Sequence, residues 1–393
     1  MTNILALDGI SGLKQASWLR QFAFDSTPPI RDLEKEEEKW GSFFELSDGY
    51  LAIQDGQTVA CAFDVAFEQQ IRGTILPMAG IGSVAVHPEY RRQGFAKLTL
   101  SRLFQGAKER GAVVSCLFPF LESFYERMGY VSFPYRLSMS FPVEKLQALL
   151  KMPMSGRVRL LSLQKDYETY RRFTRKYFEQ THGFAWKEEG WWDRKHRDRN
   201  SFWLATAESA TGEIVGMMPY QSVGMQDRLV AERMFYLNQE GKYLLLNWLA
   251  RYMGQAGQIQ LNLPASGLEA PFLPNLNPKI SAITPPMGRV LQFSALQGLK
   301  VGAGTCRISI TDPLCPWQEG AYELSAGLDH RLHIKPIPTS SNQLKAQAIS
   351  ALIYGTHDPA EFSFRGWGTL DASAIQDLRD LFPRQSPYLH EEF

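Results

Sequence analysis

The sequence lacks both a marked net charge and any long apolar segment, and each absence limits what the protein can do. Its 42 lysine and arginine residues balance 41 aspartate and glutamate residues, which leaves a formal net charge of +1. A chain so nearly neutral has no overall attraction to nucleic acid or anionic lipid, so any anion recognition must be local. No run of about 18 apolar residues is present, and the start MTNILALDGI has no basic segment. We therefore expect a cytoplasmic protein that binds no nucleic acid and does not insert into a membrane.

Paired cysteines and clusters of metal ligands are also missing. The four cysteines, Cys61, Cys116, Cys306 and Cys315, form no CxxC pair and lie mostly in apolar stretches. Buried free thiols in a reducing compartment account for this pattern better than disulfides or metal ligands do. The histidines form no cluster with metal-ligand spacing, so we expect no bound metal.

Length predicts several domains, and one segment predicts a binding site. A chain of 393 residues exceeds what a single hydrophobic core usually serves, so two or three domains are expected. Residues 83–104, SVAVHPEYRRQGFAKLTLSRLF, have the pattern of a strand, a glycine turn and an amphipathic helix. A hairpin about Asp55 and Gly56 precedes this segment, and the apolar strand AVVSCLFPF follows it.

The glycine turn RRQGFA is suited to binding a pyrophosphate. Backbone N–H groups at a helix N-terminus lack partners within the helix, and the helix dipole attracts negative charge there. Gly94 permits close approach of the backbone, and Arg91 and Arg92 add cationic side chains. The spacings of a Walker loop and of a dinucleotide fingerprint are both absent. A solvated basic loop before a surface helix is the alternative interpretation.

This turn resembles the signature R/Q-x-x-G-x-G/A of the GNAT N-acetyltransferases, with Arg91, Gly94 and Ala96 after the strand VAV. The resemblance implies that the turn holds the pyrophosphate of acetyl-coenzyme A, the co-substrate. It also implies that the preceding strand offers backbone groups to the pantetheine arm. The cofactor-binding residues expected are Val84, Ala85, Val86, Arg91, Arg92, Gln93, Gly94, Phe95, Ala96, Lys97, Phe120 and Leu121.

The segment FLESFYERMGYV extends the resemblance, because Tyr125 stands where GNAT enzymes place their general acid. A phenol at the sulfur can protonate the departing thiolate, and such a proton transfer typically contributes about 10² to 10⁴ in rate. The alternative is a core tyrosine that packs beside Phe124 and Met128.

The rest of the chain predicts two further domains. Residues 156–264 repeat the coarse pattern of the first domain, but LNQEGKYLLL replaces the phosphate turn and places Glu240 beside the glycine. An acid there repels pyrophosphate, so the second copy is expected to be structural. Prolines between 264 and 286 indicate an extended connection, and the closing motifs look like a sterol-carrier-type fold. The expected fold class is α+β: two tandem GNAT-like acetyltransferase domains, the second degenerate, followed by a sterol-carrier-protein-like C-terminal domain. Their expected bounds are 1–150, 151–285 and 286–393.

This arrangement resembles the Eis (enhanced intracellular survival) family. The resemblance implies acetylation of amines of aminoglycosides, and in some cases of lysine side chains, by a hexamer built from two trimers. It also implies that the general base is the terminal carboxylate, here that of Phe393. Such a carboxylate has a reference pKa near 3.5, so it needs proximity to the amine or a relaying water. A frayed tail is the alternative.

A polycationic amine substrate calls for an acidic pocket with apolar walls. By their positions, Asp25 and Glu392 are candidate acids, and Phe24 and Trp40 are candidate walls. The run EKEEEKW, residues 34–40, is better explained as a solvated helical face. Two functions remain as alternatives to a small-molecule acetyltransferase: a non-catalytic lipid-binding carrier or sensor with a vestigial first domain, and an acetyltransferase acting on protein lysines.

Overall fold

The computed structural model describes residues 2–7, 9–24, 34, 46–187, 202–224, 227–264, 273–390 and 393. The described residues form two compact units. The first unit combines residues 1–133, 182–191 and 286–393, and the second combines residues 134–181 and 192–285. The first unit is therefore assembled from three separate parts of the sequence.

The sheet of the first unit is built around the predicted hairpin. Strands β2 (Ser47–Gln54) and β3 (Gln57–Ile71) meet at Asp55 and Gly56, whose φ angles of 52° and 83° suit a tight hairpin turn. The strand order is β1-β2-β3-β4-β5-β16-β6, and β9 pairs with the end of β3. The remaining strands of this sheet are β1 (Thr2–Ala6), β4 (Thr74–Val86), β5 (Val114–Leu117), β6 (Val131–Ser132), β9 (Ala185–Trp186) and β16 (Met287–Val290).

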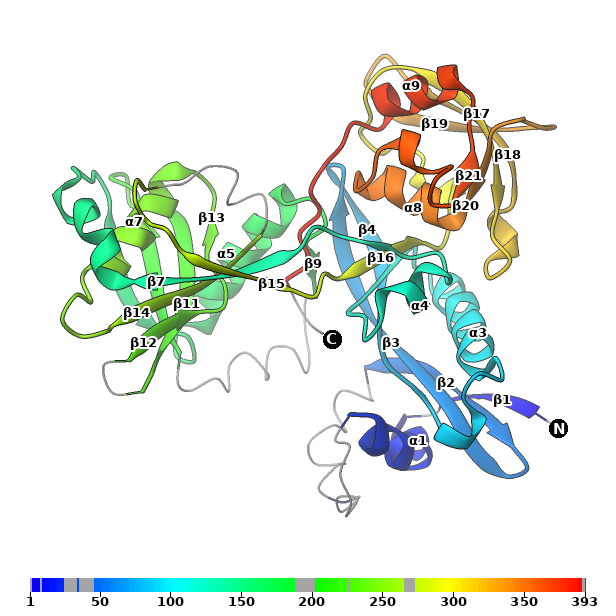
Figure 1. Cartoon of the computed structure of the whole chain (residues 1–393), viewed down its shortest axis with the longest axis horizontal. Helices are drawn as coiled ribbons and strands as arrows, with labels where there is room; N and C mark the ends of the chain where they lie inside the picture. The colour runs from blue at the N-terminus through cyan, green and yellow to red at the C-terminus, as the bar shows by residue number, and fades with distance from the viewer. Residues whose placement is uncertain are drawn as a thin grey trace. The chain divides into compact units, whose positions relative to one another are not determined.

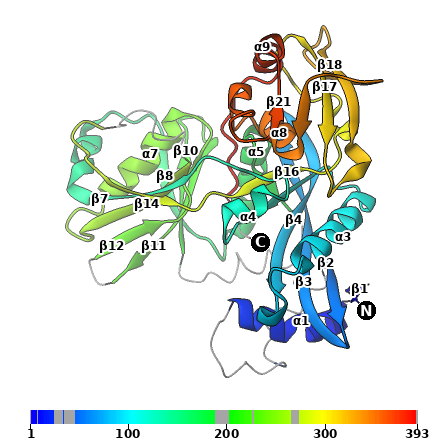
Figure 2. The ribbon, with the colours of Figure 1, turned by 45° about the vertical axis from the view of Figure 1, so that its right-hand side comes forward.

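Helix α3 (Phe95–Glu109) covers this sheet because its apolar residues recur at helical spacing. Phe95, Leu100, Leu103, Phe104 and Ala107 are buried along one side of the helix. Both ribbon views show α3 running along the sheet, and helix α1 (Gly9–Phe24) lies near the end of the sheet away from helix α8 (Ala346–Tyr354) (Figures 1 and 2). The short helix α4 (Glu122–Glu126) follows β5.

The second unit has its own sheet, of order β15-β7-β14-β12-β11-β10-β8, with β13 paired to β11. The predicted succession of strand, helix, hairpin, strand, helix and strand is confirmed in β8 (Arg157–Ser162), α5 (Tyr167–Gln180), β10 (Trp203–Glu208), β11 (Ile214–Val223), β12 (Arg228–Ala231), α7 (Gln239–Ala250) and β14 (Gln258–Pro264). Strands β7 (Arg136–Pro142), β13 (Phe235–Tyr236) and β15 (Lys279–Ile283) complete the sheet.

A third sheet, of order β19-β18-β17-β20-β21, belongs to the first unit. Its strands are β17 (Thr305–Thr311), β18 (Gly320–Ala326), β19 (Leu332–Ile337), β20 (Gln343–Lys345) and β21 (Gly368–Thr369), and helices α8 and α9 (Ala372–Leu381) accompany it. The expected α+β fold class, with tandem GNAT-like folds and a sterol-carrier-like domain, is confirmed by this architecture.

Two strands lie in different sheets from those that the sequence-based bounds of 150 and 286 imply. Strand β7 pairs with β14 and β15, so residues 136–142 belong to the second unit. Strand β16 inserts between β5 and β6 of the first sheet. The expected connection between 264 and 286 also contains a strand, β15. The alternation of apolar residues predicts a strand but not the strand with which it pairs. The placement of β7 and β16 in these sheets therefore could not be predicted from the local sequence.

The cysteines and the hydropathy of the helices agree with the composition. All four cysteines are buried free thiols, as expected, and burial raises the pKa of Cys61 and Cys116 to about 12. Among the described residues, no helix is both long and apolar enough to cross a membrane.

Helix α8 is fixed to the first sheet through its C-terminal carbonyl groups. The Arg72 side chain, at the β3–β4 turn, donates to the carbonyls of Ile353 and Leu352, each at 2.8 Å. His182 Nε2 lies 2.9 Å from the Tyr354 carbonyl, and the Arg72 N–H donates to His182 Nδ1 at 3.1 Å. Because Nδ1 accepts, Nε2 must carry the proton. Burial lowers the pKa of His182 to about 4 from an ordinary value of 6.5, so the imidazole stays neutral in the folded protein.

This neutral histidine predicts a loss of stability in acid. Between about pH 6.5 and 4 the unfolded chain binds a proton at His182 that the folded chain does not, so the free energy of unfolding decreases as pH falls. The proton uptake at His182 lowers the free energy of unfolding by at most about 3 kcal/mol over that range.

His182→Gln keeps a donor and an acceptor but cannot titrate. Urea denaturation of both proteins at several pH values should show the difference in stability shrinking toward acid. Taking this difference cancels other groups, such as Asp64, whose pKa burial raises to about 6. A difference independent of pH would contradict the assignment.

Candidate functional site

The candidate site begins where β4 leaves its neighbour β5. The two strands pair in parallel only from Met78 to Ile81 on β4, and β4 then continues to Val86. On its other side, β4 carries a bulge, because the register with β3 passes from Gly82 to Ala85 while β3 passes from Phe63 to Cys61. Ser83 in the bulge has φ 51°, and Arg20 Nε donates to its hydroxyl at 3.1 Å. Residues 82–86 therefore present an edge that β5 does not cover.

A tight turn carries the chain from β4 into α3. His87 caps the short 3₁₀ helix Pro88–Tyr90 by accepting from the Glu89 N–H at 3.3 Å. Gly94 then precedes α3 with φ 88°, in the left-handed region that favours glycine. The Leu98 N–H donates to the Gly94 carbonyl at 3.0 Å, so the N–H groups of residues 95–97 precede the first helical bond. A side chain added at Gly94 would meet no atom within 4 Å. The helix N-terminus thus opens onto free space.

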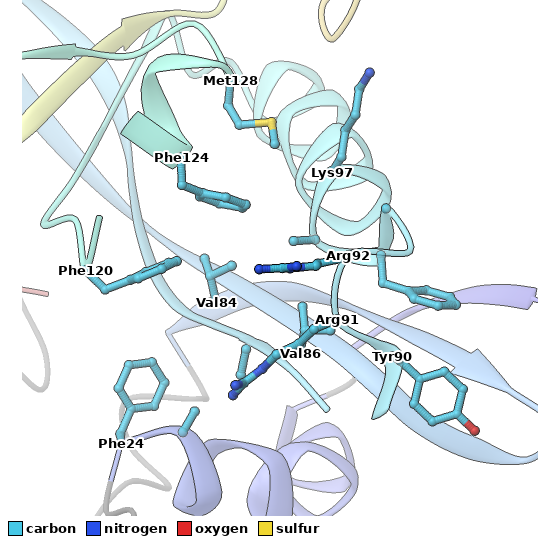
Figure 3. Close-up of a pocket in the computed structure, with 15 residues that line it drawn as sticks. Phe24, Val84, Val86, Tyr90, Arg91, Arg92, Lys97, Phe120, Phe124 and Met128 are labelled. Carbon is cyan, nitrogen blue, oxygen red and sulfur yellow. The ribbon is translucent and has the colours of Figure 1, made fainter. Parts of the chain in front are cut away.

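This space is a cavity of about 630 Å³. Figure 3 shows the side chains of Arg91 and Arg92 pointing into it, whereas Lys97 points away along the helix. The cavity is lined by Ala23, Phe24, Val84, Ala85, Val86, Tyr90, Arg91, Arg92, Gly94, Phe95, Ala96, Lys97, Phe120, Phe124 and Met128. A groove with an apolar wall and a cationic helix N-terminus suits an elongated ligand that carries phosphate at one end.

The lining brings together most of the residues expected to bind the cofactor, with two exceptions. Gln93 is not in the lining, and its side chain donates to the Glu89 carbonyl at 3.0 Å, which closes the turn. Leu121 is exposed and precedes helix α4. These two predictions rested on proximity in sequence, and neither residue faces the cavity.

Four lining residues were missed as site residues: Ala23, Tyr90, Phe124 and Met128. Ala23 belongs to the end of α1, far away in the sequence, and no local signal marks it. Phe124 and Met128 lie four residues apart about α4, so helical spacing from Phe120 could have placed them on one side.

Tyr125 lies in the last turn of α4 and is 4% exposed. Its ring packs against those of Phe120, Phe124 and Tyr130, with centroids 5.6, 5.0 and 6.0 Å away. Burial raises the pKa of its phenol well above the ordinary value of 10, which keeps the group protonated at neutral pH. The ring of Tyr125 is therefore buried, and its neighbours Phe120 and Phe124 line the cavity.

The last residue of the chain lies against β4. The ring of Phe393 packs between those of Phe67 on β3 and Phe118 after β5, with centroids 5.0 and 5.7 Å away. A methyl group added at Gly82 would lie 3.3 Å from a terminal oxygen of Phe393. The terminal carboxylate thus lies beside Gly82, next to the bulge of β4. Gly82 is two residues before Val84, which lines the cavity. In the structure, Phe393 is packed against the sheet and does not form the frayed tail of the alternative interpretation.

Of the expected substrate-binding residues, Phe24 lines the cavity and is 60% exposed. Asp25, Trp40 and Glu392 lie outside the described residues, as does the run EKEEEKW except for Glu34. Within the described ranges, no group of three or more His, Cys, Asp or Glu side chains is placed to hold a metal ion.

The equivalent turn in the second unit is closed. The Asn238 side chain caps α7 by accepting from the Gly241 N–H at 2.9 Å. A side chain at Gly241 would clash with the Val215 carbonyl, and Glu240 accepts a hydrogen bond of 2.8 Å from Ser155. The backbone donors that face open space at Gly94 are here replaced by an occupied, packed helix start.

Comparison with known proteins agrees with this geometry. Residues 11–132 match the family described as acetyltransferase (GNAT) domain, and residues 293–390 match the sterol carrier protein domain. The chain therefore carries a GNAT acetyltransferase domain followed by a GNAT-like unit and a sterol-carrier-like domain. It is an enzyme of the GNAT N-acetyltransferase class. No curated protein matches the chain.

Several solved structures share the whole architecture. A protein from Enterococcus faecalis V583, described as of unknown function and a probable N-acyltransferase, is 19% identical with a TM-score of 0.86, and the match covers 100% of both chains. A GCN5-related N-acetyltransferase from Kribbella flavida is 21% identical, with a TM-score of 0.79 and coverage of 100% of this chain and 99% of that one. Eis1 from Mycobacterium abscessus is 15% identical, with a TM-score of 0.78 and full coverage of both. At these identities the likeness concerns the fold.

The open turn at Gly94 predicts a sharp effect of substitution. Gly94→Val adds a β-branched side chain at φ 88° and fills the space in front of the helix N-terminus. We expect acetyl-coenzyme A to bind at least about tenfold more weakly, a loss of about 1.4 kcal/mol, because the added side chain blocks the approach of the pyrophosphate to the helix N-terminus. Isothermal titration calorimetry measures the change. Gly111→Val is the matched control, because Gly111 has φ 92°, follows the other end of α3 and also has no neighbour within 4 Å. Equal affinities for both variants and the native protein would contradict the assignment. Gly241 is unsuitable as a control because it is packed.

Proposed function

We propose that this protein is an Eis-type enzyme that transfers the acetyl group of acetyl-coenzyme A to primary amines of a polycationic substrate such as an aminoglycoside. The observation that carries the proposal is the position of the terminal carboxylate of Phe393 beside Gly82 on β4. A carboxylate at the exposed edge of the strand that also walls the cofactor cavity is suited to accept a proton from an amine attacking there.

The residues around the cavity fit acetyl-coenzyme A. The N–H groups of residues 95–97 and the cations Arg91 and Arg92 are suited to a pyrophosphate. The edge of β4 from Gly82 to Val86 can pair with the amides of an extended pantetheine arm, as an added strand would. Phe120, Phe124 and Met128 form the apolar wall opposite this edge.

The proposed reaction needs two proton transfers, and the chain offers a group for each. Bound acetyl-coenzyme A supplies the acetyl group as a thioester, whose C–S bond breaks as the C–N bond to the amine forms. The Phe393 carboxylate accepts the proton that the amine loses, directly or through a water. Tyr125 donates a proton to the departing sulfur, since its phenol is protonated at neutral pH.

The two alternative functions make different demands on the site. A vestigial first domain would not need an open turn at Gly94. The second unit, in which the equivalent turn is capped and packed, is an example of a closed turn on the same fold. An enzyme for protein lysines would present the same ammonium to the same two groups, so it differs in substrate and not in the chemistry proposed here. By analogy with the Eis family, we also propose a hexameric assembly.

Tyr125→Phe tests the acid. The change removes the hydroxyl and keeps the ring with its three aromatic neighbours, so folding and acetyl-coenzyme A affinity should hold. Turnover should fall about 10²-fold or more, because the departing thiolate is no longer protonated. Steady-state kinetics and calorimetry on one preparation separate the two quantities. Full turnover would leave Tyr125 with its packing role alone.

Extending the chain by two glycines after Phe393 tests the base. The extension converts the carboxylate into a neutral amide, so the initial rate should fall by about 10² to 10⁴ while acetyl-coenzyme A affinity changes little. Rates are measured with an aminoglycoside, a polyamine and a lysine peptide, and we expect the aminoglycoside to be fastest. Glu392→Gln is compared in parallel, since its carboxyl neighbours the terminus in sequence. A folded, extended enzyme that works at the native rate would place the base elsewhere, with Asp25 the next candidate.

A further inference from the structure

The C-terminal tail reaches the first sheet along a short segment from another part of the sequence. This segment, residues His182–Trp186, is called the tail seat below. It groups with the first unit, although the residues before it and those after 191 belong to the second. Nothing in the proposed chemistry uses it.

The tail seat is attached firmly to strand β3. The Gly183 N–H donates to the Gln70 carbonyl at 2.7 Å, and the Gln70 N–H donates to the Phe184 carbonyl at 3.0 Å. The Gln69 side chain donates to the Gly183 carbonyl at 2.8 Å. Strand β9 then continues the pairing, with Ala185 and Trp186 opposite Gln69 and Glu68. The same strand, β3, carries Phe67, on which the Phe393 ring packs.

The tail lies directly on this seat. The Tyr388 N–H donates to the His182 carbonyl at 2.9 Å. The His390 ring stacks on that of Phe184, with centroids 3.7 Å apart and planes inclined by 13°. Between these residues Leu389 is fully buried. Tyr388 and His390 therefore both contact the tail seat, which in turn is hydrogen-bonded to β3.

Seat and tail approach each other closely at Gly183. Its φ is 83°, and a Cβ added there would lie 2.6 Å from Pro387 Cβ and 2.7 Å from the Tyr388 nitrogen. Carbon atoms do not tolerate contacts under about 3 Å, so the tail would have to move, including its backbone at Tyr388. The absence of a side chain at residue 183 thus permits the observed path of the tail.

We infer that Gly183 is a positioning residue for the terminal carboxylate: by letting the tail lie against β3, it fixes where Phe393 reaches β4. Phe393 is three residues after His390, which allows a span of at most about 10 Å even when extended, so a shift at Tyr388 is passed to the carboxylate. This inference rests on the proposed function, because it assigns Gly183 an effect through the base. A displacement of about 1 Å at a reacting group can cost on the order of 10²-fold in rate.

Gly183→Ala tests the inference, with Gly212→Ala as the matched control. Gly212 has the same φ of 83°, lies in a hairpin turn and has no neighbour within 4 Å, so it reports the backbone strain alone. For Gly183→Ala we expect kcat to fall about 10²-fold with acetyl-coenzyme A affinity unchanged, and hydrogen exchange in the peptide 385–393 to accelerate. The control should change neither quantity. Thermal denaturation of both variants checks that the fold is retained.

Combining Gly183→Ala with the two-glycine extension separates this inference from the proposed function. If Gly183 acts through the carboxylate, the double variant should be no slower than the extended chain alone. Additive losses, or unchanged exchange in residues 385–393, would overturn the inference. If the extension alone leaves the rate unaffected, the proposed base is wrong. Accelerated exchange in Gly183→Ala would in that case still support the seating of the tail by Gly183.

Discussion

The separation of β4 from β5 after Ile81 is the constraint on which the site depends. Parallel pairing stops there because β5 ends at Leu117, while β4 continues for five residues with a bulge at Ser83. One consequence is a free backbone edge that lines the candidate cavity. Close to the same point of β4, the Phe393 ring lies against Gly80 and between Phe67 and Phe118, and a terminal oxygen faces Gly82. The cavity in which we propose that acetyl-coenzyme A binds and the proposed base therefore both lie beside the same irregular segment of β4.

The sheet that carries this segment is tied to the end of the chain by contacts that join distant parts of the sequence. Strand β16 completes the sheet beside β5, and its Arg289, fully buried, donates to both carboxylate oxygens of Asp312 at 2.6 and 2.8 Å. Breaking such a pair costs about 3–5 kcal/mol, because a buried charge is left without its partner. Arg72 fixes α8 by donating hydrogen bonds to the carbonyls of Leu352 and Ile353 at the C-terminal end of the helix. The sterol-carrier-like domain is therefore bound to the sheet at two buried arginines, and the tail that follows α9 starts from a fixed point.

The sequence predicted those parts of the site whose residues are close together along the chain. The strand, turn and helix of residues 83–104 follow from local periodicity, and Gly94 with Arg91 and Arg92 follows from the chemistry of a helix N-terminus. The family resemblance, rather than any pattern in the tail, pointed to Phe393. Three features could not be predicted: the wall from α1, the insertion of β16 and the tail seat. Each depends on pairing between distant segments. The spacing of apolar residues shows which face of a helix or strand is buried, but it does not show which other segment packs against that face.

The two tandem copies show how little separates a binding turn from a structural one. Both have a glycine at the start of a helix that packs on a sheet. In the first, Gly94 has φ 88° and faces open space, whereas in the second Gly241 lies inside the helix and its N–H is satisfied by Asn238. The Asn238 cap satisfies one of the N–H groups that a phosphate would use, and packing against the Val215 carbonyl closes the approach at Gly241, so the two turns differ without a difference in fold. The second copy also contributes sequence to the first unit, since the tail seat is drawn from within it. In the proposed mechanism, the catalytic unit therefore obtains its base from the end of the third domain and the support for that base from the middle of the second.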